Sequence, residues 1–351
     1  MKAEPLLLRM NDGTPVTPEL WDKRRAELID ILCNEEYGYS PAPPETVTGR
    51  TTGIEQKCCS GHAVLETVEI SFQTDKGTYS FPVNCFFPND GKKHPVFVML
   101  NFRPDTYDRY CPAEELIDNG FALIVAYYKD IATDDGDFSS GLAAGYDHEA
   151  YSWGKISMWA WGASRIVDYL YSRPEIDCDN IAVAGHSRLG KTALWCGAQD
   201  SRVKYVISND SGCAGAAYER IKHTGAERVE DIVRVFPYWF CENYKKYAGH
   251  PEAMPFDQHF LIAASAPRYV CVGSASRDVW ADPYSEQLCC IAASDAWNML
   301  GHNGFSGNAE PAKVGQDFPI GYIGYHLRDG IHFFGRADWL QYMKFIGSKI
   351  R

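Results

Sequence analysis

The segment Gly-His-Ser-Arg-Leu-Gly-Lys at residues 185–191 holds the side chains in this sequence that are most clearly suited to catalysis. It follows a short apolar run typical of a buried strand and leads into a helical pattern. A sharp strand-to-helix turn lifts a serine hydroxyl clear of a sheet, and the helix start places the Arg188 N–H where an oxyanion would form. The pattern therefore predicts Ser187 as the nucleophile of an acyl-transfer reaction. The usual spacing is Gly-x-Ser-x-Gly, but here Leu189 precedes Gly190, so a plain strand–turn–helix connection is the alternative.

A serine nucleophile needs a base, and the base needs a carboxylate that orients it. In α/β-hydrolases these residues follow in the chain order serine, acid, histidine. Of the ten histidines, His332 lies in a loop before the last predicted helix, which is where such enzymes carry the base. We expect His302 and His326 to lie in loops as ordinary residues. The sequence therefore predicts His332 as the base.

Two aspartates could orient this base. Asp278 follows a predicted strand at 268–274, and the loop after the penultimate strand is the usual place for the acid. Asp210 stands 23 residues after the serine, at the end of the next predicted strand. Its other interpretation is an aspartate turn before a glycine-rich loop. Asp282 lies next to Pro283, and we expect it to cap the following helix.

Alternating strands and helices must position these side chains. From residue 95 onward the pattern predicts a mostly parallel sheet with helices on both faces, preceded by an antiparallel hairpin. We predict an α/β-hydrolase fold in a single domain of residues 1–351, with an N-terminal helix and hairpin at 17–90 and an insertion at about 210–260. Strands are expected at 64–72, 79–87, 95–100, 121–128, 181–184, 203–208 and 268–274, and helices at 113–119, 153–171, 191–198, 284–300 and 338–350.

The composition argues against several other functions. The 351 residues include 34 basic and 46 acidic side chains, a net charge of −12, which disfavours nucleic acid and anionic membranes as partners. The longest apolar run, residues 121–128, is much shorter than the roughly 18 residues of a membrane span. No zinc, phosphate-loop or dinucleotide motif occurs, so we expect neither metal nor cofactor. The 12 scattered cysteines and the short apolar run at residues 6–8 favour a reducing compartment, and we predict a cytoplasmic protein.

The motifs in this order resemble the glucuronoyl esterases, carbohydrate esterase family 15. Residues 185–191 are similar to the family signature Gly-Cys-Ser-Arg-x-Gly-Lys, with His186 in place of the cysteine. The similarity covers roughly residues 95–350 and continues through Asn209-Asp210-Ser211-Gly212, Pro237-Tyr238-Trp239-Phe240, Ala266-Pro267-Arg268 and Asp278-Val279-Trp280. The family cleaves the ester between a 4-O-methyl-glucuronic acid carboxyl on xylan and a lignin alcohol.

The resemblance implies a role for each matched residue. Ser187 would be the nucleophile and His332 the base. Arg188 would support the oxyanion with its side chain as well as its backbone. Lys191 would bind sugar hydroxyls, and Trp280 would contact the uronoyl ring.

The acid occupies either of two positions in this family, which match Asp210 and Asp278 here. We predict Asp278 as the main partner of the base, because it has the standard chain position and leads directly into Trp280. Asp210 is then a secondary or supporting carboxylate. Glu227 and Glu230 lie in the predicted insertion, and neither is assigned a role.

Two other functions are kept as alternatives. One is an acetyl xylan esterase or a general carbohydrate esterase of the same fold, and the other is a carbohydrate-binding pseudoenzyme without turnover. Lys191 and Trp280 favour a uronoyl ring over an acetyl group, and the complete serine, aspartate and histidine set favours an enzyme. The expected partner is a small-molecule or oligosaccharide ester, and the sequence defines no oligomeric state.

Overall fold

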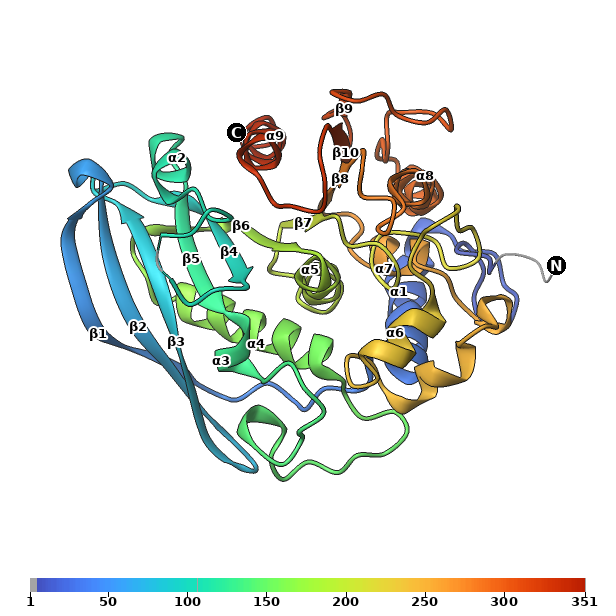
Figure 1. Ribbon diagram of the computed structural model, residues 1–351, viewed down its shortest axis with the longest axis horizontal. Coiled ribbons are helices and arrows are strands. Elements are labelled where there is room, and N and C mark those ends of the chain that lie inside the picture. The colour runs from blue at the N-terminus through green and yellow to red at the C-terminus, as the bar shows by residue number, and fades with distance from the viewer. Residues whose placement is uncertain (1–4, 106, 351) are drawn as a thin grey trace.

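A ten-stranded mixed sheet lies at the centre of the described part of the chain, residues 5–105 and 107–350, in the computed structural model (Figure 1). Its strands are β1 (Val47–Cys58), β2 (Ala63–Thr74), β3 (Gly77–Pro88), β4 (His94–Asn101), β5 (Ala122–Tyr127), β6 (Ile176–His186), β7 (Tyr205–Asn209), β8 (Tyr269–Ala275), β9 (Asp317–Phe318) and β10 (Ile323–Arg328). They lie in the order β1-β2-β3-β5-β4-β6-β7-β8-β10-β9. Neighbours from β5 to β10 pair in parallel, whereas β1, β2, β3 and β9 pair antiparallel. The predicted mostly parallel sheet with a preceding hairpin is confirmed.

Helices cover both faces of this sheet (Figure 1). They are α1 (Trp21–Leu32), α2 (Ala113–Asp118), α3 (Tyr128–Ile131), α4 (Lys155–Leu170), α5 (Arg188–Gln199), α6 (Val229–Val235), α7 (His259–Ala263), α8 (Pro283–Met299) and α9 (Arg336–Gly347). Side chains alternate along β4: Val96 and Val98 join the core with α1, α4, α5, α7 and α8, whereas Phe97 and Met99 join the core with α2 and α9. Burial on both faces explains why this strand is a continuous apolar run.

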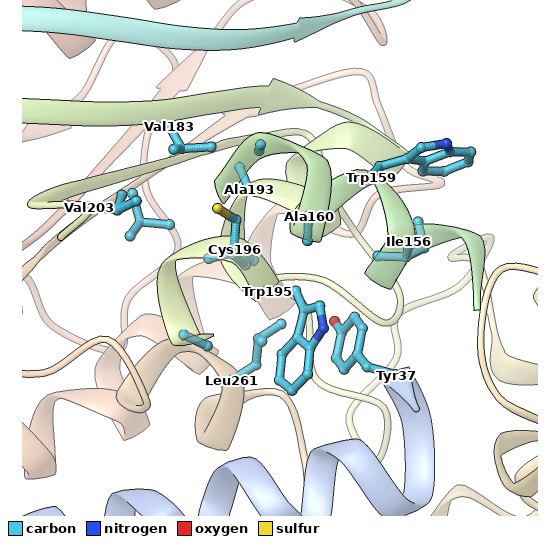
Figure 2. Close-up of a cluster of buried hydrophobic side chains, with 14 of the residues drawn as sticks. Tyr37, Ile156, Trp159, Ala160, Val183, Ala193, Trp195, Cys196, Val203 and Leu261 are labelled. Carbon is cyan, nitrogen blue, oxygen red and sulfur yellow. The ribbon is translucent and has the colours of Figure 1, made fainter. Parts of the chain in front are cut away.

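The core under the middle of the sheet fixes α5, the helix that follows Ser187. Trp195 of α5 is fully buried, and its ring stacks on Tyr37 with centroids 4.2 Å apart and planes 10° apart. Figure 2 shows the two rings side by side, with Leu261 of α7 next to them. The Tyr37 hydroxyl also donates a 3.0 Å hydrogen bond to the carbonyl oxygen of Ala214, in the loop after β7. The N-terminal segment therefore holds both α5 and this loop.

Some features differ from the sequence-based expectation. β1, β9 and β10 were not expected. The side chains of β1 are exposed along almost its whole length, so no apolar pattern marks it. β10 contains His326, which is buried and lies 2.9 Å from a carboxylate oxygen of Asp338. The expectation that His326 lies in a loop is wrong, because a carboxylate buried in α9 stabilises an imidazole inside this strand.

Two expectations concern the surroundings of the protein. No helix within residues 5–105 and 107–350 is long and apolar enough to cross a membrane. Residues 1–4, which open the segment considered for targeting, lie outside the described residues.

Candidate active site

A sharp turn between β6 and α5 presents the predicted nucleophile. Ser187 has φ 57° and ψ −127°, a conformation that non-glycine residues rarely adopt. Its N–H donates to the carbonyl oxygen of Asn209 at 2.8 Å, which ties the turn to the end of β7. A Cβ on Gly185 would collide with the Leu189 carbonyl, and one on Gly190 would lie 3.0 Å from a serine side chain after β7. The absence of a side chain at position 190, in place of 189 in the usual motif, therefore still allows α5 to pack closely against the loop after β7.

The predicted base and main acid are in direct contact. Nδ1 of His332 lies 2.5 Å from a carboxylate oxygen of Asp278. Asp278 is buried, whereas the His332 side chain is 42% exposed. A carboxylate accepts a hydrogen bond from Nδ1–H, so Nε2 of His332 carries the lone pair that can take a proton. The catalytic roles of both residues stay predictions.

Asp210 lies beside this pair and has other partners. Oxygens of Asp210 and Asp278 and a ring nitrogen of His332 all lie within 4.8 Å of one another. One Asp210 oxygen accepts from the Ala275 N–H at 2.7 Å, and the other accepts from Arg328 at 3.4 Å. Burial, followed by the charges of nearby carboxylates, raises the pKa of Asp210 well above its ordinary value. The geometry therefore puts Asp278 in contact with His332 and Asp210 in a supporting position.

Arg188 lies at the start of α5 and is fixed on three sides. Its guanidinium group forms an ion pair with Asp134 and lies 4.5 Å from the ring centre of Trp239 and 5.0 Å from that of Phe236. Asp134 also accepts from the Trp239 indole N–H at 2.9 Å. Nε of Arg188 is buried and has no hydrogen-bond partner among the described residues. The resemblance implies that this side chain supports an oxyanion, and that role stays a prediction.

The predicted site residues share one cavity of about 180 Å³. Twelve residues line it: Ser187, Arg188, Lys191, Asp210, Ser211, Gly212, Glu227, Phe236, Trp239, Trp280, Ala281 and His332. All predicted site residues except Asp278 line this cavity, and Asp278 contacts His332, which does line it. The fold therefore brings every predicted site residue together.

Lys191 and Trp280 lie on the cavity wall in different ways. The Lys191 side chain is buried, and its ammonium group donates to the carbonyl oxygens of Ser211 and Cys213 at 2.6 and 2.5 Å. It also lies 3.5 Å from a carboxylate oxygen of Glu227. Trp280 is 49% exposed, so its ring is open to a ligand. Lys191 thus holds the loop after β7, and a sugar hydroxyl would have to share its donors.

Sequence reasoning did not single out the cavity residues Glu227 and Trp239, nor Asp134, which pairs with Arg188. Glu227 had no role assigned, Asp134 lay in a loop recognised only by its aspartates and glycines, and Trp239 belonged to a matched motif without a stated role. Glu230 accepts from a backbone N–H at Gly249 and is not among the residues that line the cavity. No spacing in the sequence connects these residues to Ser187, because the fold brings them there from separate loops.

Comparisons with known proteins identify the family of this chain. Residues 70–301 match a family model described as glucuronyl esterase of fungi. A carbohydrate esterase from an unknown prokaryotic organism is 35% identical, covering 97% of this chain and 88% of that protein. The 4-O-methyl-glucuronoyl methylesterase of Hypocrea jecorina is 30% identical over 87% of this chain. The chain spans 64% of the length of that fungal protein.

Solved structures show the same fold. A structure described as a promiscuous esterase of carbohydrate esterase family 15 from the marine bacterial metagenome has a TM-score of 0.90 and 32% identity. The superposition covers 100% of this chain and 98% of the chain in that structure. A glucuronoyl esterase from Solibacter usitatus has a TM-score of 0.89 at 31% identity, again over 100% and 98% of the two chains. The α/β-hydrolase fold is therefore confirmed, and the chain belongs to the glucuronoyl esterase family, carbohydrate esterase family 15.

Proposed function

We propose that this chain is a serine carboxylesterase that hydrolyses glucuronoyl esters, in particular the 4-O-methyl-glucuronoyl esters of plant cell-wall xylan and lignin. The observation that carries the proposal is that Ser187 and His332 line one cavity while Asp278 contacts Nδ1 of the same imidazole. The relatives from Hypocrea jecorina and Podospora anserina are 4-O-methyl-glucuronoyl methylesterases, which supports the uronoyl ester as substrate.

The reaction proceeds in two half-reactions. Nε2 of His332 takes the proton of Ser187 while Oγ attacks the ester carbonyl carbon. The bond to the alcohol oxygen then breaks, the imidazolium gives its proton to the leaving alkoxide, and the acyl group stays on the serine. Water attacks this acyl-enzyme by the same steps, which releases the free acid and restores the hydroxyl. The carboxylate of Asp278 stabilises the imidazolium in both halves.

The oxyanion of each tetrahedral intermediate needs donors that are already in place. The backbone N–H of Arg188 lies at the start of α5, and we propose the guanidinium of the same residue, which lines the cavity, as a second source of donors. Asp134 and Trp239 hold the guanidinium, so little reorganisation is needed when charge develops. Each such donor contributes about 3 kcal/mol to the stabilisation of the transition state.

The cavity wall offers groups suited to a sugar ring. Trp280 is half-exposed and can contact the apolar face of a uronoyl ring. Glu227 contributes carboxylate oxygens, which can accept hydrogen bonds from hydroxyl groups. A bare acetyl group would make no contact with the Trp280 ring and no hydrogen bond to Glu227, which favours the larger acyl group.

The decisive experiment measures hydrolysis of methyl 4-O-methyl-glucuronate by the wild type and by Ser187→Ala. We expect the variant to keep the fold and lose roughly six orders of magnitude in kcat, because the nucleophile is gone. A fluorophosphonate probe should label the wild type and leave the variant unlabelled. Hydrolysis by the variant near the wild-type rate would contradict the serine mechanism, and a folded, unreactive wild type would favour the carbohydrate-binding pseudoenzyme.

A broader carbohydrate esterase is the second candidate. The Lys191 ammonium group already donates to two carbonyl oxygens, which weakens its selectivity for sugar hydroxyls. In addition, one structural relative is described as a promiscuous esterase of this family. The ratio of kcat/KM for methyl 4-O-methyl-glucuronate to that for acetylated xylan separates the two: a ratio above about 100 supports the uronoyl ester, and a ratio near one supports the broader enzyme.

A further inference from the structure

The ring of His186 packs against the ring of His332. Their centroids are 4.3 Å apart and their planes differ by 40°. His186 is 4% exposed and is enclosed by the rings of Tyr110 at 5.9 Å, Phe334 at 6.1 Å and Phe102 at 6.2 Å. The residue before the nucleophile is therefore a buried aromatic surface under the base.

Hydrogen bonds fix the tautomer of His186. The Tyr342 hydroxyl donates to the Ser208 carbonyl at 3.5 Å, so it accepts from the amide Nδ2 of Asn209 at 3.1 Å. This places Oδ1 of Asn209 toward His186, at 2.7 Å from Nδ1. An amide oxygen only accepts, so Nδ1 of His186 must donate. The ring is thereby held in one orientation by the end of β7.

His186 also keeps its neutral form beside the base. Burial, followed by the charge of His332, lowers the pKa of His186 to about 3. The imidazolium that forms on His332 during catalysis therefore meets an uncharged ring and no second cation.

His332 needs such a support. Its side chain is 42% exposed, and its only hydrogen bond between the described residues is the one from Nδ1 to Asp278. A single hydrogen bond at one ring atom leaves the ring free to tilt about that contact, which would move Nε2 away from the Ser187 hydroxyl. Packing against a second ring removes this freedom.

We propose that His186 is a positioning residue that holds the His332 imidazole in its catalytic orientation through ring packing. The inference rests on the proposed esterase mechanism of Ser187 and His332. His186 is not among the residues that line the cavity, so it acts on the base and leaves substrate binding unchanged.

The test compares His186→Ala and His186→Phe by kcat and KM on methyl 4-O-methyl-glucuronate. His186→Ala removes the ring, and we expect kcat to fall about 10- to 100-fold at unchanged KM, the size of effect that a misplacement of about 1 Å produces. His186→Phe keeps a ring of similar size without the bond to Asn209, and we expect kcat within threefold of the wild type. Circular dichroism and thermal unfolding confirm that each variant is folded.

His259→Ala provides the matched control. His259 is equally buried and packs against Phe260 at 4.8 Å, but it lies in α7 and does not line the cavity. We expect this variant to be less stable and to keep its kcat.

The possible outcomes separate the proposals. A folded His186→Ala variant with wild-type kcat would overturn the positioning role. So would a folded variant whose KM rises by as large a factor as its kcat falls. So would a His186→Phe variant that falls as far as His186→Ala, because the bond to Asn209 would then carry the effect. A wild type without activity on the uronoyl ester would instead overturn the proposed function.

Discussion

Asp278 and Asp210 lie near the same imidazole but have different partners. Asp278 contacts Nδ1 of His332, whereas Asp210 accepts from a backbone N–H and from Arg328. Asp278→Asn would favour the wrong tautomer of the base, so kcat should fall by up to about four orders of magnitude. Asp210→Asn should cost less than tenfold, because Asp278 holds Nδ1 of His332 and the asparagine amide keeps an oxygen that can accept from the Ala275 N–H. Rates on methyl 4-O-methyl-glucuronate measure both variants. Equal losses would mean that the two carboxylates share the role.

Lys191 connects the cavity wall to the loop after β7. Its ammonium group has two carbonyl acceptors and an ion-pair partner in Glu227. Lys191→Met keeps most of the volume and removes these donors. We expect the free energy of unfolding to fall by about 3 kcal/mol, because buried acceptors and a carboxylate are left without a partner. We also expect KM to rise more for the glucuronate ester than for an aryl acetate. Equal changes in KM would make Lys191 a structural residue only.

At the scale of elements, α8 holds the loop that carries Asp210. Glu286 of α8 is fully buried and accepts from the Gly212 N–H at 2.9 Å, from the Ser274 hydroxyl at 2.5 Å and from the Ser211 hydroxyl at 3.3 Å. Burial is the main cause that raises the pKa of Glu286 from 4.5 to about 7. The loop and the end of β8 therefore depend on a carboxyl group that titrates near neutral pH.

This pKa predicts how stability depends on pH. Between pH 4.5 and about 7 the Glu286 carboxyl binds its proton more tightly in the folded state than in the unfolded state. The contribution of protonated Glu286 to the free energy of unfolding is therefore fully present below pH 4.5 and is lost as pH rises through about 7. Relative to Glu286→Gln, the wild type should lose up to about 3 kcal/mol of unfolding free energy between pH 4.5 and 8. Urea unfolding at both pH values measures the difference. Exposed Glu114→Gln is the control and should follow the wild type. A constant difference between wild type and Glu286→Gln would refute the shift.

The elements that the sequence predicted and those it missed differ in how they are buried. β4 and β5 are apolar on both faces, and such runs are visible in a sequence. β1 is exposed and pairs only with β2, so its position depends on a partner and on no pattern of its own. The same holds at the site: Ser187 and His332 follow from motif and chain order, whereas Asp134 reaches Arg188 only through tertiary packing.

At the scale of the whole molecule, the parallel sheet assembles the site. Ser187 follows β6, Asp210 follows β7, Asp278 comes after β8, and His332 comes after β10. These four strands are neighbours in the sheet and run in parallel, so their carboxyl ends lie at one edge. The chain order serine, acid, histidine was therefore enough to predict which residues meet. It was not enough to predict the cavity wall, because Glu227 and Trp239 come from the segment between β7 and β8.

The folded chain is held together without any disulfide bond. All 12 cysteines are free, and each is buried except Cys178, which is half-buried. Burial raises the pKa of Cys33 and Cys196 to about 12, so these thiols stay protonated and unreactive at neutral pH. We expect the thermal unfolding midpoint to be the same with and without a reducing agent. We also expect a thiol reagent to modify Cys178 first in the native protein.

The unfolded chain gives the stricter form of this test. Without reductant, denatured protein should react at all 12 thiols, because none is bonded. Cys178→Ser should remove the fast native reaction and leave 11 slow thiols, since the other side chains become accessible only when the core opens. Ten reactive thiols in the denatured wild type would reveal a disulfide, and a midpoint lowered by reductant would show that it stabilises the fold. Rapid native labelling at several positions would mean that the sheet and its helices open far more readily than so large a core allows.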